Sequence, residues 1–184
     1  MFLFIGLGNK GSKYQNNRHN IGFLFIDYLV KKYGLLKINN KLKSVLYKGN
    51  IMNNNILLSQ PQTMMNLSGE SVRLVKNFYK IKQDNIFVFH DEIDLDIGRI
   101  KFKFGGGAAG HNGIKNIDKN IGNEYYRIRI GINNNNYSEV NKFVLSDFSK
   151  DEKILLNYKI NLIDKNIRYV FKKDISNFMN EINK

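Results

Sequence analysis

Two of the three histidines stand where a strand-like segment gives way to polar residues. His19 comes after the apolar segment 2–7 and its glycine turn, and the apolar segment 85–91 ends in His90 and Asp91. An imidazole that stays neutral can act as a general base. In open α/β sheets, ligands gather at the carboxyl ends of strands. The turn that carries His19 and the strand end that carries Asp91 are therefore predicted to meet.

His19 also stands just before a predicted helix. The helix is expected to begin near Asn20 and to stop at Gly34. Its apolar residues recur at helical spacing on one face, at Ile21, Leu24, Phe25, Tyr28 and Leu29. The dipole at a helix N-terminus opposes protonation and so favours the neutral form of His19. From position alone, the alternative is that His19 only caps a turn.

The glycine turn has the spacing of a dinucleotide-binding site. Gly6, Gly8 and Gly11 follow the first predicted strand, and a pyrophosphate would bind N–H groups of a helix that opens directly after them. Here residues 12–18 are polar instead, and Asp27, the nearest acid, lies inside the helical pattern. A nucleotide-dependent oxidoreductase is therefore the weaker alternative.

The balance of charges points to a polyanionic partner. The net charge is +13 and the isoelectric point is about 9.8, so nucleic acid is the simplest partner. Heavy use of Asn, Ile and Lys could also reflect an AT-rich genome. The absence of cysteine excludes disulfides, thiolate metal sites and a cysteine nucleophile. The 184 residues predict one domain, no apolar run reaches the roughly 18 residues of a membrane span, and the cytosol is the expected compartment.

Two predicted strands alternate cations with apolar residues. One carries Arg99, Lys101 and Lys103, and the other carries Arg127 and Arg129. If the two strands are neighbours, their polar faces form one cationic patch suited to phosphate. Taken singly, each strand is only a solvated face.

Asparagines stand in three loops that leave predicted strands. Asn9 follows the first strand, Asn66 follows strands predicted for residues 43–51 and 55–59, and Asn112 stands where the glycine-rich loop 105–114 meets a helix. Lone asparagines usually cap or turn the chain, which is the alternative for Asn66. The histidines and nearby acids lack the spacing of a zinc site, so no metal is expected.

The remaining pattern is helical. Ser68 is predicted to cap a helix that runs to about Lys80 and turns Phe78 toward the core. Helices are also predicted from Ser149 onward, with an interruption near Asp174 before a last amphipathic piece.

Five motifs, in order and spacing, resemble bacterial-type peptidyl-tRNA hydrolase. They are GLGNKGSKYQNNRHNIGF, PQTMMNLSGESV, FVFHDEIDL, GRIKFKFGGGAAGHNGIKNI and YRIRIGI. The resemblance covers most of the first three quarters of the chain. It implies one α/β domain over residues 1–184, with a mixed, mostly parallel twisted sheet flanked by helices and C-terminal helices from about residue 150. It also implies cleavage of the ester between a stalled peptide and its tRNA.

Carried over by position, the resemblance implies a site. His19 matches the catalytic base and Asp91 the acid that orients it. The other implied residues are Asn9, Tyr14, Asn66 and Asn112 for the cleft, and Lys103 and Arg129 for the 5′-phosphate of tRNA. No metal or cofactor is implied, and the expected partner of this cytoplasmic monomer is tRNA, not a membrane. Three positions depart from the family pattern, with Lys10 and Asp96 in place of prolines and Ala109 in place of a glycine.

Without a cysteine or a GxSxG turn, direct attack by water is the simpler chemistry. The amides of Asn66 or Asn112 could position the water, hold the peptide backbone or donate to the developing oxyanion. The main alternative is a non-catalytic RNA-binding protein on the same scaffold, as in plastid splicing factors that resemble these hydrolases.

Overall fold

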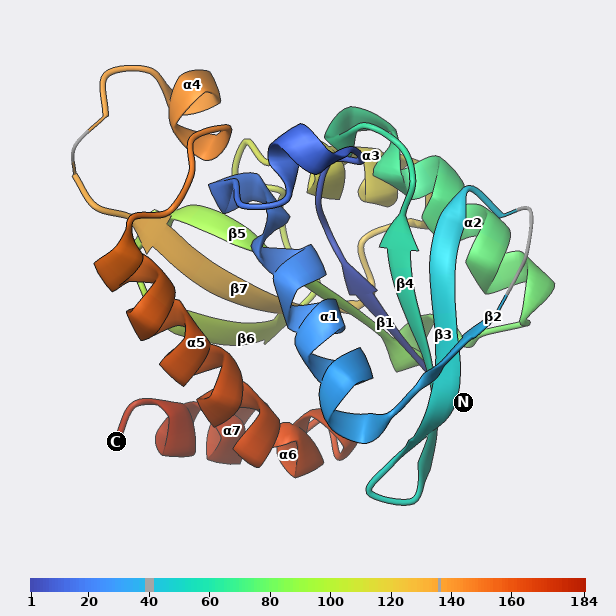
Figure 1. Cartoon of the computed structure of the whole chain (residues 1–184). Coiled ribbons are helices and arrows are strands. Elements are labelled where there is room, and N and C mark those ends of the chain that lie inside the picture. Colours follow the sequence, from blue (N-terminus) through green and yellow to red (C-terminus); the bar gives the residue numbers. More distant parts are fainter. Residues whose placement is uncertain (39–41, 136) are drawn as a thin grey trace.

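A twisted sheet of seven strands runs through the computed structural model, which describes residues 1–38, 42–135 and 137–184 (Figure 1). The strand order is β2-β3-β4-β1-β5-β7-β6. The strands are β1 Phe2–Gly6, β2 Leu36–Ile38, β3 Ser44–Ile51, β4 Asn54–Pro61, β5 Ile86–Asp96, β6 Ile100–Phe104 and β7 Tyr126–Asn133. The predicted buried first strand that ends in a glycine turn is confirmed by β1.

The four central strands β4, β1, β5 and β7 are parallel to their neighbours. β3 is antiparallel to both β4 and β2, and β6 is antiparallel to β7. Five strands (β2, β4, β1, β5 and β7) therefore run one way and two run the other, so the predicted mixed, mostly parallel sheet is confirmed. β1 stops at Gly6, opposite Phe89, whereas β5 continues past Asp91. That difference in length leaves Asp91 beyond the end of β1.

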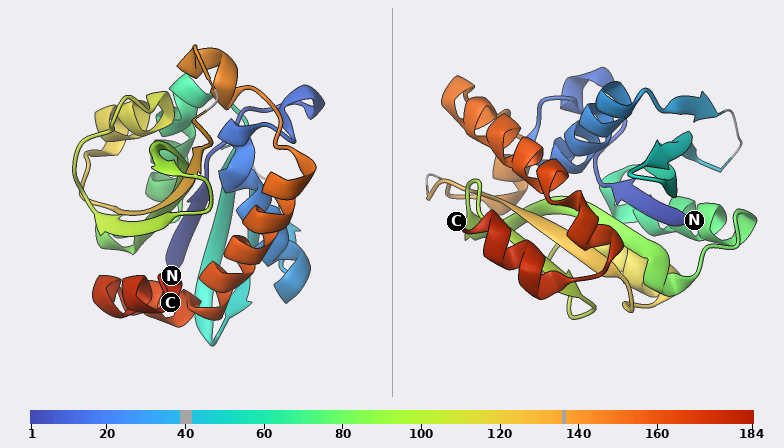
Figure 2. Two further views of the ribbon diagram at one scale, coloured as in Figure 1. Left: turned by 90° about the vertical axis from the view of Figure 1, so that its left-hand side faces the viewer. Right: turned by 90° about the horizontal axis from the view of Figure 1, so that it is seen from below.

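Helices cover both faces of the sheet (Figure 2). One face packs against α1 Ile21–Tyr33, α5 Lys150–Lys165, α6 Ile167–Phe171 and α7 Ile175–Ile182. The other face packs against α2 Ser68–Phe78 and α3 Asn112–Ile121. The short α4 Val140–Val144 lies beyond the sheet, near the end of β7 (Figure 1). Short 3₁₀ turns complete the fold, at η1 Ser12–Tyr14, η2 Arg18–Asn20, η3 Met65–Leu67 and η4 Gln83–Asn85.

The two halves of the core follow the alternation of side chains along the strands. Phe4 faces the α1 side, and Leu3 and Ile5 face the α2–α3 side. Aromatic rings fill much of the α1 side, where Phe25 stacks on Phe89 with ring centroids 4.2 Å apart. None of the described helices is both long and apolar enough to cross a membrane.

The first and last helices end and begin as predicted. Gly34 closes α1 with a left-handed φ of 60°. Ser149 caps α5 in a reciprocal capping box with Glu152, and Asp174 caps α7. The C-terminal helical pattern is broken once more, at Asn166, between α5 and α6.

Two predictions for α2 are wrong. Ser68 is not the cap, because the 3₁₀ turn η3 leads directly into the helix and the Ser68 hydroxyl donates to the carbonyl of Met65. Phe78 is 66% exposed and does not face the core. At this end of the helix, Val75 and the neighbouring Tyr79 make the core contacts instead, so helical spacing alone misplaced Phe78.

The glycines of the first turn serve helix packing. A Cβ on Gly6 would lie 2.2 Å from the carbonyl oxygen of Gly22, and one on Gly22 would lie 2.3 Å from the oxygen of Phe89. β1 and α1 can approach this closely only because both residues lack a side chain. No α-helix opens at the glycine turn, because the short 3₁₀ turn η1 follows Gly11 and α1 begins only at Ile21. This geometry does not favour the dinucleotide alternative.

Candidate active site

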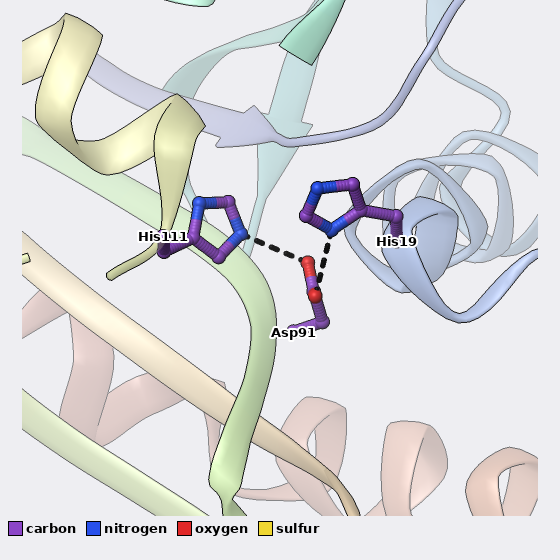
Figure 3. Close-up of side chains that lie close together, drawn as sticks. All are labelled: His19, Asp91 and His111. Carbon is purple, nitrogen blue, oxygen red and sulfur yellow. Dashed lines mark hydrogen bonds and ion pairs between the residues drawn. The ribbon is translucent and has the colours of Figure 1, made fainter. Parts of the chain in front are cut away.

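His19 and Asp91 meet at the end of β1. His19 lies in η2, directly before α1, and the Nδ1 atom of its ring is 2.7 Å from Oδ2 of Asp91 (Figure 3). The two residues are 9% and 2% exposed. The turn after β1 brings η2 over the end of that strand, and the longer β5 supplies the carboxylate. The predicted meeting of the two segments is therefore observed.

A second histidine, His111, binds the other oxygen of Asp91. Its Nε2 is 2.9 Å from Oδ1 of Asp91 (Figure 3). Its Nδ1 caps α3 by accepting hydrogen bonds from the backbone N–H groups of Gly113, at 3.1 Å, and Ile114, at 3.3 Å. Because Nδ1 accepts, Nε2 carries the proton and donates it to the carboxylate. Helix α3 thus selects the tautomer of His111.

The same reasoning assigns the tautomer of His19. An ionised carboxylate only accepts hydrogen bonds, so Nδ1 of His19 is the donor to Asp91. In the neutral ring, Nε2 then has a free lone pair. That atom is the proton acceptor that a general base requires.

The groups around Asp91 favour the ionised form of its carboxyl. Burial by itself would raise the pKa of the Asp91 carboxyl, but the neighbouring His19 and His111, by charge and by hydrogen bonds, hold it well below its usual range. Burial lowers the pKa of His19, yet the charge of Asp91 and their hydrogen bond outweigh it, so the pKa is raised above the ordinary value. The helix dipole, which was expected to oppose protonation of His19, is therefore not the deciding influence.

The predicted asparagines occupy different places around His19. Asn9 is 4% exposed, and its side-chain oxygen accepts from the backbone N–H of Met65 at 2.7 Å. Asn20 fixes the Asn9 backbone from the other side, with hydrogen bonds of 2.9 and 3.0 Å. Since its oxygen is engaged, the amide group of Asn9 remains as a donor. Asn66 lies exposed in η3 and Asn112 is the first residue of α3.

These residues line a cleft made of two adjoining depressions that share His19, each of about 230 Å³. The first is lined by His19, Asp91, Glu92, Ile93, Ala109, Gly110, His111, Asn112, Val140, Asn141 and Val144. The second is lined by Asn9, His19, Met64, Met65, Asn66, Asn112, Asn141, Val144 and Leu145. Asn112 and residues of α4 belong to both, so the cleft runs between α3 and α4.

Sequence reasoning missed His111 and the whole of α4. His111 stood next to Asn112 in a motif already quoted, but a histidine cap gives no recognisable pattern before the fold is known. α4 is only five residues long, which is too short for a helical periodicity to be recognised. Tertiary contacts hold this segment. Arg18 bonds the hydroxyl of Ser146 at 3.2 Å, and its guanidinium lies 4.4 Å from the ring of Phe143.

The segment after α4 is tied to the turn that carries His19. Arg18 is buried and forms an ion pair with Glu152 of α5 at 2.9 Å. Asn17 donates to the carboxylate of Asp147 at 2.6 Å. The residues on the N-terminal side of His19 are thereby fixed by the C-terminal quarter of the chain.

Tyr14 is not brought to the cleft. It lies half-buried in η1, with Lys13 Nζ 4.7 Å from the centre of its ring, and it is not among the described residues that line either depression. Of the three departures from the family pattern, Ala109 lines the cleft and has a left-handed φ of 47°. A side chain is disfavoured in that conformation, and glycine is the usual residue. Lys10 and Asp96 are exposed.

The two cationic strands are neighbours. β6 pairs with β7 so that Lys101 is opposite Arg129 and Lys103 is opposite Arg127. Arg127 is buried and donates to the carbonyls of Gly105, Gly106 and Gly107, so it holds the glycine loop. The predicted patch therefore exists, but its arginines already have partners within the protein.

Lys103 and Arg129 differ in their surroundings. Nε of Arg129 donates to Oε2 of Glu92 at 2.7 Å. Burial and the charges of Arg127 and Arg129 lower the pKa of Lys103. Crowding of like charges favours an anion at this place, because an anion relieves the repulsion.

Among the described residues, one group has the composition of a metal site. It consists of His19, Asp91 and His111, whose candidate ligand atoms lie within 4.8 Å of one another. Those atoms are already hydrogen-bonded to each other as donors and acceptors. The group therefore fits a proton-transfer site better than a metal site. His90 is buried behind it and bonds the backbone oxygen of Asp91 at 2.7 Å.

Comparisons with known proteins point to one family. The family model described as peptidyl-tRNA hydrolase matches residues 3–184. A peptidyl-tRNA hydrolase of Clostridium botulinum (strain Eklund 17B / Type B) is 46% identical, over 100% of this chain and 96% of that protein. One of Rickettsia prowazekii (strain Madrid E) is 47% identical, over 99% of this chain and 100% of that protein. The crystal structure of peptidyl-tRNA hydrolase from Acinetobacter baumannii is similar with a TM-score of 0.92 at 37% identity, over 100% of this chain and 94% of that chain.

Proposed function

This chain belongs to the peptidyl-tRNA hydrolase family and hydrolyses peptidyl-tRNA, and we propose that His19 is its general base and Asp91 the residue that orients it. The observation that carries the proposal is the buried 2.7 Å hydrogen bond between the two side chains. It leaves Nε2 of His19 as the proton acceptor, and His19 lines both depressions of the cleft. The alternative, a non-catalytic RNA-binding protein on this scaffold, is not favoured.

In the proposed reaction, Nε2 of His19 takes a proton from water while the water oxygen attacks the ester carbonyl carbon. Asp91 stabilises the imidazolium that forms and holds the ring in place. Collapse of the tetrahedral intermediate breaks the ester bond, and the imidazolium returns its proton to the leaving ribose oxygen. General-base catalysis of this kind typically contributes about 10²- to 10⁴-fold in rate.

We propose that side-chain amides bind the peptide and the developing oxyanion. The engaged oxygen of Asn9 supports a role as donor, and the positions of Asn66 and Asn112 in the same depression support contacts to the peptide backbone. Carboxamides donate and accept without charge, so they fit peptides of any sequence. Tyr14, which lies away from these residues, is proposed for substrate binding only by family resemblance.

The cleft predicts selectivity for substrates with a blocked amino group. The described residues that line the depression shared by His19, Asn66 and Asn112 include no carboxylate. A free α-ammonium would lose water there without gaining a counter-charge. We expect N-acetyl-aminoacyl-tRNA to be hydrolysed at least roughly tenfold faster than the same aminoacyl-tRNA with a free amine. Equal rates of hydrolysis for the blocked and the free aminoacyl-tRNA would contradict the proposed placement of the peptide.

We propose that Lys103 and Arg129 bind the 5′-phosphate of tRNA. Lys103→Ala and Arg129→Ala are expected to raise KM, to leave kcat near its normal value and to reduce the salt dependence of kcat/KM. The measurement is steady-state hydrolysis at several salt concentrations. Lys31→Ala, a change of the same charge at an exposed position of α1, is the matched control. If KM is unchanged in both variants, the phosphate binds elsewhere.

The substrate also indicates where in the cell the protein acts. Peptidyl-tRNA arises on ribosomes, and we propose that the protein recycles tRNA from stalled peptides in the cytosol, as a monomer. We further propose that residues 1–184 act as one domain, since α5, α6 and α7 pack on the core shared with α1.

A further inference from the structure

Glu92 connects the catalytic cleft to the cationic patch. It follows Asp91 on β5, lines the cleft beside His19 and is 3% exposed. Its carboxylate is not free to act on a substrate, because Oε2 accepts from Nε of Arg129 at 2.7 Å and Oε1 accepts from the backbone N–H of Asp94 at 3.2 Å. A buried carboxylate with both oxygens engaged holds its partner in a defined orientation.

The bond to Glu92 determines which edge of Arg129 remains available. A guanidinium has five N–H donors, and the one on Nε points to Glu92. For the two Nη groups, no hydrogen bond is found among the described residues. These are the groups that can bind a phosphate through two parallel hydrogen bonds. Arg129 therefore presents a fixed fork instead of a freely rotating charge.

The surroundings of Arg129 favour an anion. It is opposite Lys101 on β6, and the Lys103–Arg127 pair lies two residues further along the two strands. Arg127 is occupied by the carbonyls of the glycine loop, and Glu92 is the carboxylate bound to Arg129. The patch keeps a net positive charge with one oriented guanidinium, which suits a phosphate monoester.

We propose that Glu92 is a positioning residue that orients Arg129 for the 5′-phosphate of tRNA and so relates the bound phosphate to the catalytic centre. Glu92 and Asp91 are consecutive on one strand, so the guanidinium fork and His19 are held by neighbouring carboxylates. A tRNA whose 5′-phosphate is bound by Arg129 would then have its ester held at a defined position relative to His19. This inference rests on the proposed role of Arg129.

The test compares N-acetyl-aminoacyl-tRNA with and without its 5′-phosphate. In the normal enzyme, KM is expected to be lower for the phosphorylated substrate. Glu92→Ala is expected to raise KM for the phosphorylated substrate by roughly three- to tenfold, to leave KM for the dephosphorylated one nearly unchanged and to change kcat little. Glu92→Gln keeps a side-chain acceptor for Nε, so it is expected to rescue most of the discrimination.

Two controls separate positioning from charge and from folding. Glu181→Ala removes an equally charged side chain from α7, which packs on the face of the sheet opposite to the patch, and should leave the KM ratio unchanged. If Glu92→Ala is too unstable to assay, Glu92→Met keeps a side chain of similar length without an acceptor, and the same loss of discrimination is expected.

Each outcome has one meaning. If the Glu92 variants without an acceptor keep the normal KM ratio, or lower kcat equally on both substrates, the inference is wrong. Arg129→Ala shows which proposal has failed. Should Arg129→Ala also keep the ratio, the phosphate assignment itself falls. Should it abolish the ratio while Glu92→Ala keeps it, Arg129 binds the phosphate without help from Glu92.

Discussion

His19→Ala is expected to lower kcat by roughly 10²- to 10⁴-fold while leaving the affinity for tRNA nearly unchanged. The reason is that Nε2 of His19 is the proposed acceptor of the water proton, whereas the cationic patch lies on β6 and β7. Single-turnover hydrolysis of N-acetyl-aminoacyl-tRNA measures the first quantity, and direct tRNA binding measures the second.

The small remaining rate would come from the amides and from binding alone. Phe78→Ala, which removes an exposed side chain at the end of α2, is a suitable control for the loss of a ring. Near-normal hydrolysis by His19→Ala would remove His19 from its proposed role. Equal loss of hydrolysis and of tRNA binding would point to a disturbed fold instead.

Asp91→Asn is expected to reduce kcat by roughly 10³- to 10⁴-fold although it changes the side chain by one atom. A carboxylate accepts from both His19 and His111, but a carboxamide has only one accepting oxygen. Its amino group must therefore face one of the two rings. His111 cannot become the acceptor at Nε2 without losing the two backbone hydrogen bonds of its Nδ1.

The amino group of the new asparagine therefore faces His19. That ring must then accept at Nδ1 and carry its proton on Nε2, where no lone pair is left for the water. The fold of α3, through its histidine cap, determines that the wrong tautomer of His19 is the one selected. An exposed aspartate at the end of the same strand gives the matched control, since Asp96→Asn should leave kcat unchanged.

The pH profile adds an independent readout. Asp91 raises the pKa of His19, and burial lowers it. In the normal enzyme, activity is expected to fall as the pH drops through this raised pKa, because the protonated ring cannot act as a base. Without the charge of Asp91, burial dominates and the pKa of His19 decreases. The acid limb of the residual activity in Asp91→Asn should thus move to lower pH, and a shift to higher pH would contradict the proposed pairing.

Most of the secondary structure could be predicted from the sequence because its signals are local. The helical spacing of apolar residues predicted α1, and the alternation of cations with apolar residues predicted β6 and β7. The errors came where tertiary packing overrides local pattern. Ser68 looks like a cap, but η3 continues into α2 and satisfies the Ser68 hydroxyl within that turn. Phe78 has core spacing, yet it is exposed, and the next residue, Tyr79, packs against the core instead.

The candidate site was readable only in part. His19, Asp91 and the asparagines came from motif positions and from the rule that strand ends carry ligands. His111 and α4 did not, because a histidine cap and a five-residue helix carry little signal of their own. The partner of Arg129 also could not be predicted from the sequence, since no local pattern indicates that the Glu92 side chain turns toward β7.

The amino-acid sequence by itself determined most of the strands and helices, the polar loops at the strand ends, the excess of positive charge and the resemblance to a family. These depend on the order of residue types over short stretches. Only the tertiary structure decided which nitrogen of His19 and of His111 carries the proton, that Asp91 outweighs burial in setting the pKa of His19, and which cation each carboxylate holds. The physical reason is that hydrogen-bond direction and desolvation depend on groups far apart in the chain, as the separation of 72 positions between His19 and Asp91 shows.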